Sequence, residues 1–423
     1  MPAREALDDS EGHPLPGSWA KETLDDAATA GLLRRRRSRA GGSHVRCRVD
    51  GRDVLVLSSN DYLGLSIHRE VREAAARAAI DRGVGASGSA HLSGCHEAAE
   101  KLEHNVSAFE GTVTATLAPT GYAANLAAIQ ALGGRDAVIL SDGGNHASVI
   151  DGCRMSGCEV QVYRHLDLDD LERRLRRASG RPVIVSDTVF SMEGTCADVA
   201  QLNSLAEHHG AWLLLDEAHA TGVLGPGGRG GAAAAGIPPS ADHVVRVVTF
   251  SKALGAGGGA ICGSRAVAQL LLQRGRALMF STALPHPTVA AATAALDVLQ
   301  RTPQLVDRLR MNARSLRQAL HGVGSSRHSA PPLRMNAQSG RHGVPWAVLP
   351  GAADMPIIAV VLGTPARALT AEQRLWESGF LVQAVRPPAV PEGTSRLRMV
   401  ASILHTASDL RDAAKAVGEA IAA

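Results

Sequence analysis

Between residues 66 and 290, short apolar runs alternate with stretches of helical periodicity. Runs that are apolar along their whole length, and that helices separate, are typical of parallel strands in a sheet covered on both faces. We therefore expect an α/β fold built on a mostly parallel sheet. The expected strands are Thr112–Ala118, Ala137–Ser141, Glu159–Tyr163, Pro182–Asp187, Trp212–Asp216, Val244–Phe250 and Gly259–Cys262. Helices are expected between most of them, including residues 121–132, 145–156, 167–178 and 198–209.

Polar residues follow the carboxyl ends of five of these expected strands. In sheets of this kind, ligands bind outside the carboxyl ends of the strands. We therefore expect the five polar segments to meet in one crevice. They are Thr120–Tyr122, Ser141–His146, Asp187–Ser191, Asp216–His219 and Ser251–Lys252.

Lys252 has the most distinctive sequence context in this crevice. It follows the mainly β-branched run Val244–Val248 and precedes the glycine-rich stretch Gly255–Gly259, so it leaves a buried strand for a loop where the backbone can approach a ligand closely. Only four of the 44 lysine and arginine residues are lysines, so lysine is not the general surface charge of this chain. A lysine held and desolvated in this way is suited to form a Schiff base.

Asp216 and two histidines indicate the kind of group that this lysine binds. A carboxylate at a strand end keeps a neighbouring pyridine nitrogen protonated, and a pyridinium ring is the electron sink for amino-acid carbanions. His219 is placed to donate to a ring hydroxyl, and His146 to lie on the face of the ring. The helix expected to begin at Gly121 offers free N–H groups to a phosphate, and Thr249 offers a hydroxyl.

The composition excludes several other classes of protein. Of the 423 residues, 45% are hydrophobic and 20% charged, which is ordinary for a globular protein. The net charge of +3 is too small to indicate a nucleic-acid or membrane partner, and the basic run Arg34–Arg39 lacks the interleaved aromatic residues of a nucleic-acid site. No apolar run is long enough to span a bilayer, and we find no signal core. The six scattered cysteines predict neither a disulfide framework nor a metal site, and we expect a cytoplasmic protein.

Five motifs occur in the order found in the α-oxoamine synthases, which the chain resembles from about residue 30 to its end. These are pyridoxal-phosphate (PLP) enzymes of the aspartate-aminotransferase-like fold (PLP fold type I), and they condense an amino acid with an acyl thioester and release carbon dioxide. The motifs are Ser58–Leu65, Asn145–Ser148, Val189–Gly194, Asp216–Val223 and Thr249–Gly255. The resemblance implies an N-terminal segment 1–57, a PLP-binding large domain 58–290 and a smaller α/β C-terminal domain 291–423.

The resemblance also implies a role for individual residues. Lys252 would form the Schiff base and act as the catalytic base, Asp216 would pair with the ring nitrogen, His219 with the ring hydroxyl, and His146 would stack on the ring. The other expected cofactor contacts are Gly121, Tyr122, Ser191 and Thr249, with Ser281 and Thr282 reaching the phosphate of a partner subunit, because dimers of the family place the active site at their interface. The expected substrate contacts are Asn60 and Arg398 for the amino-acid carboxylate, Arg34 and Thr394 for the acyl substrate, and His91 and Ser93 on the substrate side.

The segment Val385–Arg398 most resembles the biotin-pathway member of the family. This implies a homodimer that condenses L-alanine with a pimeloyl thioester of coenzyme A or of a carrier protein. The alternative within the family is another α-oxoamine synthase, which would use glycine or serine with a different acyl thioester, for instance in secondary metabolism. An aminotransferase is a more distant alternative. The chain departs from the family pattern at Cys95, at Phe280 and over residues 326–355, which we interpret as a loop.

Overall fold

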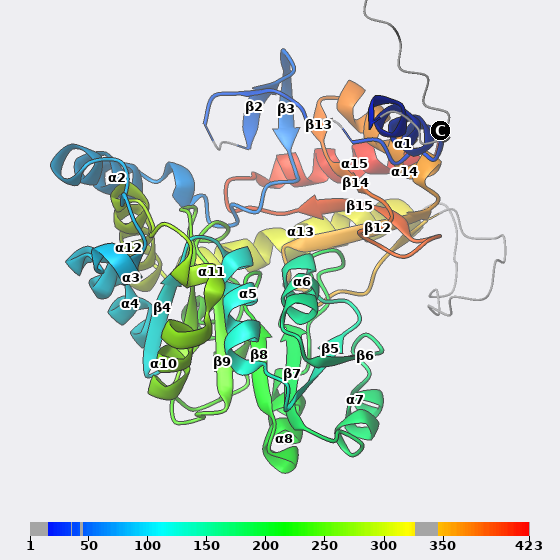
Figure 1. The fold of residues 1–423 in the computed structure, drawn as a ribbon. Helices are drawn as coiled ribbons and strands as arrows, with labels where there is room; N and C mark the ends of the chain where they lie inside the picture. Colours follow the sequence, from blue (N-terminus) through cyan, green and yellow to red (C-terminus); the bar gives the residue numbers. More distant parts are fainter. Residues whose placement is uncertain (1–15, 35, 43–44, 326–345, 423) are drawn as a thin grey trace, which may run out of the picture.

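The computed structural model describes residues 16–34, 36–42, 45–325 and 346–422. In this part of the chain, one seven-stranded sheet and two four-stranded sheets form, with helices packed around them (Figure 1). The expected α/β fold is confirmed.

The seven-stranded sheet follows the order β4-β10-β9-β8-β7-β5-β6. Its strands are β4 (Thr114–Ala118), β5 (Ala137–Asp142), β6 (Glu159–Tyr163), β7 (Arg181–Asp187), β8 (Trp212–Asp216), β9 (Val244–Thr249) and β10 (Gly259–Gly263). Strands β9, β8, β7, β5 and β6 are parallel, and β10 is antiparallel to both of its neighbours. The register pairs Asp187 with Asp216, so the carboxyl ends of β7 and β8 lie side by side.

Alternate residues of the central strands face opposite sides of this sheet and belong to different cores. Leu214 of β8 belongs to the core formed with α5 (Gly121–Leu132), α6 (Ala147–Met155) and α10 (Arg265–Arg274). Leu213 and Leu215 belong to the core formed with α7 (Leu168–Leu175), α8 (Val199–His209) and α9 (Gly230–Ala234). Because both faces are covered, the strands are apolar along their whole length.

A further group of helices covers the sheet near β4, on the left of Figure 1. Residues of α2 (Arg69–Arg82), α4 (Glu97–Glu110) and α12 (His286–Arg301) form one core with β4, β9 and β10. Four short elements connect the larger ones: η1 (Leu65–Ile67), α3 (Ala90–Ser93), η2 (Pro226–Gly228) and α11 (Arg276–Met279).

The two smaller sheets join the N-terminal and C-terminal parts of the chain. One has the order β11-β12-β15-β14, all antiparallel: β11 (Ala347–Val348), β12 (Ile357–Gly363), β15 (Ser395–Val400) and β14 (Gln383–Val385). The other has the order β1-β2-β3-β13: β1 (Arg39–Ala40), β2 (Arg46–Val49), β3 (Arg52–Val56) and β13 (Phe380–Leu381), with β13 parallel to β3. The helices of this region are α1 (Pro16–Thr29), α13 (Gln304–Ser325), α14 (Pro365–Glu377) and α15 (Ala407–Ala422).

Two helices begin later than expected because a side chain caps the first turn. Helix α6 begins at Ala147 because the ring of His146 accepts a hydrogen bond from Ser148 N, and α7 begins at Leu168 because Asp167 accepts one from Asp170 N. Of the expected loop 326–355, residues 326–345 lie outside the described residues, and the loop prediction is wrong at β11, which pairs with β12. No helix in the described ranges is long and apolar enough to cross a membrane.

Candidate active site

Lys252 lies in the loop that follows β9, at the carboxyl edge of the large sheet. The loop turns back at Gly255, whose φ is +61° and where an added Cβ would lie 2.1 Å from the backbone nitrogen of Ser66. Glycine is therefore required for this close approach. Burial lowers the pKa of Lys252 to about 8, although the nearby carboxylates of Asp216 and Asp187 favour its charged form. About a tenth of this amine is therefore neutral at pH 7, far more than for an ordinary lysine.

Asp216, the last residue of β8, is a buried carboxylate fixed by two donors. Its Oδ2 accepts a hydrogen bond of 2.6 Å from Asn125 Nδ2 on α5, and its Oδ1 accepts one of 2.9 Å from the backbone of Ala218. Asp187 lies beside it on β7. Burial, and then the charge of Asp216, raise the pKa of Asp187 well above its usual value, so Asp187 favours its protonated form.

His219 is buried and paired with a tyrosine. Its Nδ1 lies 2.6 Å from the hydroxyl of Tyr62. Burial, and then the positive charges of Lys252 and Arg398, hold the pKa of His219 well below its usual value, so the ring is neutral. Burial raises the pKa of Tyr62 to about 12. The tyrosine therefore keeps its proton and donates it to Nδ1, which leaves Nε2–H of His219 as a donor.

His146 lies at the start of α6 and is exposed on the same side of the sheet. Its Nδ1 lies 2.7 Å from Ser148 Oγ, and its backbone nitrogen donates to Asp187 Oδ1 at 3.3 Å. Burial lowers its pKa, against the charge of Asp216. The ring is thus held through Nδ1, and it lies nearly perpendicular to the ring of Tyr122, with the centroids 6.4 Å apart.

The N-terminus of α5 and the end of β9 form a narrow polar corner. Thr120 caps the helix by accepting a hydrogen bond from Ala123 N, and a Cβ added at Gly121 would lie 3.0 Å from the Cβ of Thr249. The Oγ1 of Thr249 lies 2.8 Å from Ser251 Oγ. The first N–H groups of a helix have no acceptor within it, so this corner offers backbone and hydroxyl donors to an anion. Tyr122 is exposed, and its hydroxyl donates to Asp151.

Arg398 brings three distant parts of the chain together beside this edge. It is a buried residue of β15, its Nη2 donates to Asn60 Oδ1 at 3.0 Å, and its Nε donates to the carbonyl oxygen of Ser191 at 2.6 Å. Burial lowers the pKa of Arg398. The expected pair of Asn60 and Arg398 is therefore adjacent in space although 338 residues apart in the sequence.

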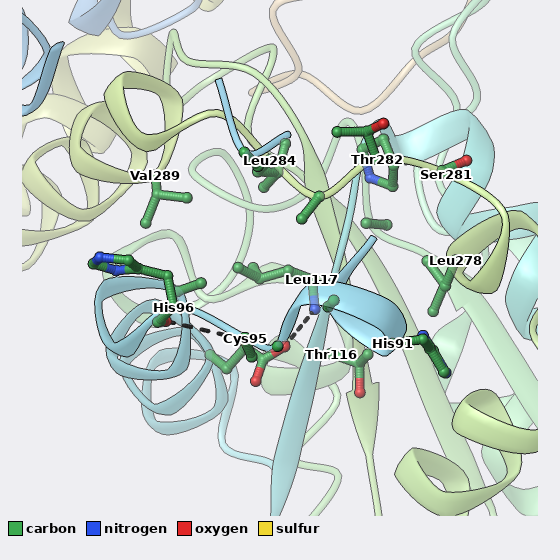
Figure 2. A pocket seen from close by; sticks show the side chains of 18 of the residues that line it. His91, Cys95, His96, Thr116, Leu117, Leu278, Ser281, Thr282, Leu284 and Val289 are labelled. Atoms are coloured by element: carbon green, nitrogen blue, oxygen red, sulfur yellow. Dashed lines mark hydrogen bonds between the residues drawn. The ribbon is translucent and has the colours of Figure 1, made fainter. Parts of the chain in front are cut away.

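Four other expected site residues gather at a separate cavity of about 740 Å³, shown in Figure 2. They are His91, Ser93, Ser281 and Thr282, and they share the cavity with Cys95, His96, Leu117 and Leu284. Lys252 and Asp216 do not line this cavity in the described structure. The structure thus divides the expected residues into a group at the sheet edge and a group at the cavity.

The two remaining expected residues lie outside both groups. Arg34 is exposed in the segment between α1 and β1, and within the described residues no hydrogen bond or ion pair links it to another expected site residue. Thr394 precedes β15 and accepts a hydrogen bond of 2.9 Å from Arg396 Nη2.

Sequence reasoning missed three residues that shape the site: Asn125, Tyr62 and Asp187. Asn125 carries a usable signal, because it is a polar residue on the buried face of a helix one turn after Gly121. Tyr62 and Asp187 lie in segments that the sequence analysis singled out, but their partners come from other segments.

Comparisons with known proteins agree with this geometry. Residues 52–417 match the family described as aminotransferase class I and II. A putative 8-amino-7-oxononanoate synthase from Desulforudis audaxviator is 39% identical over 404 residues, which cover 95% of this chain and 98% of the relative. The 8-amino-7-oxononanoate synthase of Burkholderia thailandensis is 41% identical over 392 residues, covering 92% and 94%. The solved structure of serine palmitoyltransferase from Sphingomonas wittichii has a TM-score of 0.84 at 29% identity, covering 95% and 96%.

Two of these similarities extend over almost the full length of both chains at about 40% identity, and the expected Lys252 and Asp216 lie together at the sheet edge. The chain is therefore a pyridoxal-phosphate enzyme that belongs to the class I and II aminotransferase family and, within it, to the α-oxoamine synthases.

Proposed function

We propose that this enzyme condenses L-alanine with a pimeloyl thioester, of coenzyme A or of a carrier protein, to give 8-amino-7-oxononanoate in biotin biosynthesis. The observation that carries the proposal is the similarity to 8-amino-7-oxononanoate synthases over nearly the whole chain. The segment Val385–Arg398 adds to it, because it resembles the same member of the family.

The residues at the sheet edge fit PLP. Asp216 offers a buried anion for the ring nitrogen, Nε2–H of neutral His219 offers a donor for the ring hydroxyl, and the exposed imidazole of His146 suits stacking. The corner of Gly121 and Thr249 offers donors for a phosphate. The further proposed contacts are Tyr122, Ser191, Ser281, Thr282 and Lys252. When bound, the cofactor supplies an electron sink for the carbanion at the α-carbon of the amino acid.

Lys252 is the proposed catalytic base. A lysine with a pKa of about 8 exists partly as the neutral amine near neutral pH, so it can accept the α-proton of the amino acid without a large free-energy cost. Asp216, His219 and His146 act on the cofactor rather than on the proton. Asp216 keeps the ring nitrogen charged. The nearby Asp187 favours its protonated form and so adds no second negative charge beside the ring.

Arg398 and Asn60 are the proposed anchors for the amino-acid carboxylate. An arginine held by a neutral amide on one side presents its remaining donors to a carboxylate. The proposed contacts of the acyl substrate are Arg34, His91, Ser93 and Thr394. His91 and Ser93 line the 740 Å³ cavity, whose walls also include apolar side chains such as Leu117 and Leu278.

A second candidate comes from the solved structures. Serine palmitoyltransferase is similar to this chain over 95% of its length, which favours an alternative reaction of L-serine with a long acyl thioester. Glycine with a shorter acyl group is a further alternative within the family. An aminotransferase would share Lys252 and Asp216 but would release a keto acid without using a thioester.

We also propose that the enzyme is a homodimer in which Ser281 and Thr282 serve the cofactor of the partner. Mixing two inactive variants tests this. Lys252→Ala and the double variant Ser281→Ala/Thr282→Ala, unfolded and refolded together, should regain activity, because one of the two hybrid sites then holds only native residues. Activity that stays at the level of the separate variants would contradict sites shared between subunits. The domain bounds given above and the cytoplasmic location stay predictions.

The substrate proposal is tested with a matrix of amino acids and thioesters. L-alanine, glycine and L-serine are each combined with pimeloyl, acetyl, succinyl and palmitoyl thioesters, and the products are identified by mass. We expect the alanine–pimeloyl product to dominate and Lys252→Ala to give none. A faster reaction of L-serine with the palmitoyl thioester would replace the proposal with the second candidate, and a keto acid formed without any thioester would indicate an aminotransferase.

A further inference from the structure

His165 joins two loops that carry candidate site residues. It lies in the turn between β6 and α7, and its Nδ1 is 2.7 Å from Asp142 Oδ1, while its Nε2 is 3.2 Å from Glu193 Oε2. The ring also packs edge-on against Phe190, with the ring centroids 4.3 Å apart. Asp142 begins the loop that leads to His146, and Glu193 lies in the loop that contains Ser191.

The contact with Asp142 leaves little freedom to the loop that carries His146. Oδ1 of Asp142 accepts a hydrogen bond of 2.7 Å from Gly144 N, and Oδ2 accepts one of 2.9 Å from Leu166 N. A Cβ at Gly144 would lie 2.5 Å from Nδ1 of His165. Leu166, next to the histidine, has a φ of +58°, a conformation that costs free energy in a residue other than glycine and persists only where its surroundings fix it.

The contact with Glu193 reaches the C-terminal sheet. Oε1 of Glu193 accepts a hydrogen bond of 3.0 Å from Nη1 of Arg396, whose side chain is fully buried on β15. At Gly194, an added Cβ would lie 2.3 Å from the carbonyl oxygen of Ile357, so the loop also lies directly against β12. Two residues after Arg396 on the same strand is Arg398, the proposed carboxylate anchor.

The four side chains alternate in charge from the large sheet to the C-terminal sheet: Asp142, His165, Glu193 and Arg396. Burial alone would lower the pKa of His165, but the carboxylates of Asp142 and Glu193 raise it to about 9. The close contact with His165, an ion pair of 3.2 Å, is the main cause that lowers the pKa of Glu193 to about 2. All three links are therefore between opposite charges near neutral pH, and because they are partly buried, solvent screens them less than exposed pairs.

We propose that His165 is a positioning residue that sets the distance between the carboxylate anchor and the cofactor-contacting residues. Through Asp142 it fixes the loop of His146, and through Glu193 and Arg396 it fixes the strand of Arg398. The amino acid must reach both groups at once, with its carboxylate at Arg398 and its α-carbon near Lys252. The inference rests on the proposed function of this site. Glu193 and Arg396 transmit the position and do not touch the substrate.

A purely structural role makes a different prediction from a positioning role. Loss of a structural contact would lower the stability of the fold and the retention of the cofactor together with the affinity for the amino acid. Loss of a positioning contact weakens the binding of the amino acid while the fold and the cofactor remain. The distinguishing measurement is therefore amino-acid affinity at full cofactor loading.

The experiment titrates L-alanine, glycine and L-serine into the PLP-loaded enzyme and follows the absorbance of the cofactor. His165→Ala, His165→Gln and Glu193→Gln are compared with the native enzyme. His243→Ala is the matched control, because His243 Nε2 lies 3.0 Å from Asn203 Oδ1 and His243 directly precedes β9, at the opposite end of that strand from Lys252. Cofactor content and thermal unfolding are measured on every sample.

We expect the dissociation constant of the amino acid to rise by roughly tenfold or more in the His165 and Glu193 variants, because a displaced Arg398 no longer holds the carboxylate in the geometry that the rest of the site requires. The double variant His165→Ala/Glu193→Gln should be little worse than either single variant, because both break one chain of contacts. Affinity equal to that of His243→Ala, or affinity that falls only in step with cofactor loss, would overturn the inference. A native enzyme that responds to none of the three amino acids would instead refute the proposed function, and the inference with it.

Discussion

Substitution of Asn125 by alanine tests the site through a residue that the substrate does not touch. Asn125 is 2% exposed on α5, and its amide donates to Asp216 Oδ2 at 2.6 Å and to Ser148 Oγ at 2.9 Å. Asn125→Ala removes one of the two hydrogen bonds described above to the Asp216 carboxylate and leaves the bond from Ala218 N. The carboxylate keeps its charge but loses one constraint on its position.

The expected losses in rate and in stability follow from the kind of hydrogen bond that Asn125→Ala removes. A hydrogen bond to a charged group contributes about 1.5–3 kcal/mol. If all of this free energy acts on α-proton removal, the rate falls by about ten- to a hundredfold, at roughly 1.4 kcal/mol for each factor of ten. Since the bond from Ala218 remains, we expect the lower end, about tenfold. The free energy of unfolding should fall by a similar amount, about 1–3 kcal/mol, because a buried acceptor loses its donor.

The assay is the exchange of the α-hydrogen of L-alanine with deuterium from the solvent, catalysed by the PLP-loaded enzyme. Asn203→Ala is the matched control, since Asn203 also lies on a helix and donates to a carboxylate, that of Glu207, at 2.9 Å. This exposed pair should contribute only a few tenths of a kcal/mol. An unchanged exchange rate in Asn125→Ala, or an equal loss in Asn203→Ala, would refute the argued role of the Asn125–Asp216 bond.

Three further predictions follow from the same site and its surroundings. Reduction with borohydride and peptide mapping should place the pyridoxyl group on Lys252; a label on Lys21, Lys101 or Lys415 would show that the assignment is wrong. Asp216→Asn should still bind the cofactor but slow α-hydrogen exchange by orders of magnitude, because the ring nitrogen loses its anion, and native exchange rates would contradict this. Burial, and then the charge of Glu217, raise the pKa of Glu110 from its usual 4.5 to about 8, so the folded state holds this proton more tightly and stability falls as the pH rises between the two values. Glu110→Gln should therefore raise the melting temperature above about pH 8 and leave it nearly unchanged below about pH 4.5, and equal effects at both pH values would rule out this titration.

The sequence predicts the central sheet well because its physical signal is local. Strands β6 and β8 have the expected bounds, since each reads as one run between turn residues. Lys252 and Asp216 could be predicted for the same reason, because Asp216 ends one such run and Lys252 follows another. What could not be predicted depends on contacts between distant segments. The pairing of Asn60 with Arg398 is expected only from the family resemblance, because nothing near Asn60 in the sequence indicates it, and nothing near His165 indicates a link to Arg396.

Most of the remaining differences between the expected and the observed structure come from side-chain contacts that the sequence does not reveal. The sequence marks His146 as a candidate, but only the structure shows that its ring caps α6 and thereby shortens the helix. The family resemblance assigns His91 to the substrate and Ser281 to the phosphate of a partner subunit, and only the structure shows that both line the 740 Å³ cavity. Such groupings depend on how helices pack, which periodicity does not encode.

The parallel pairing of β3 with β13 has a consequence for synthesis of the chain. Leu55 pairs with Phe380, so the fourth strand of this sheet is made about 325 residues after the third. At a synthesis rate of about 5–20 residues per second, β3 has no partner on that side for roughly 15 to 65 seconds after it leaves the ribosome. The strands of the large sheet all lie between residues 114 and 263, so the ribosome has made all of them well before it makes β13. The Asn60–Arg398 pair forms later still, so the nascent enzyme can complete its cofactor-contacting edge before it gains its amino-acid anchor.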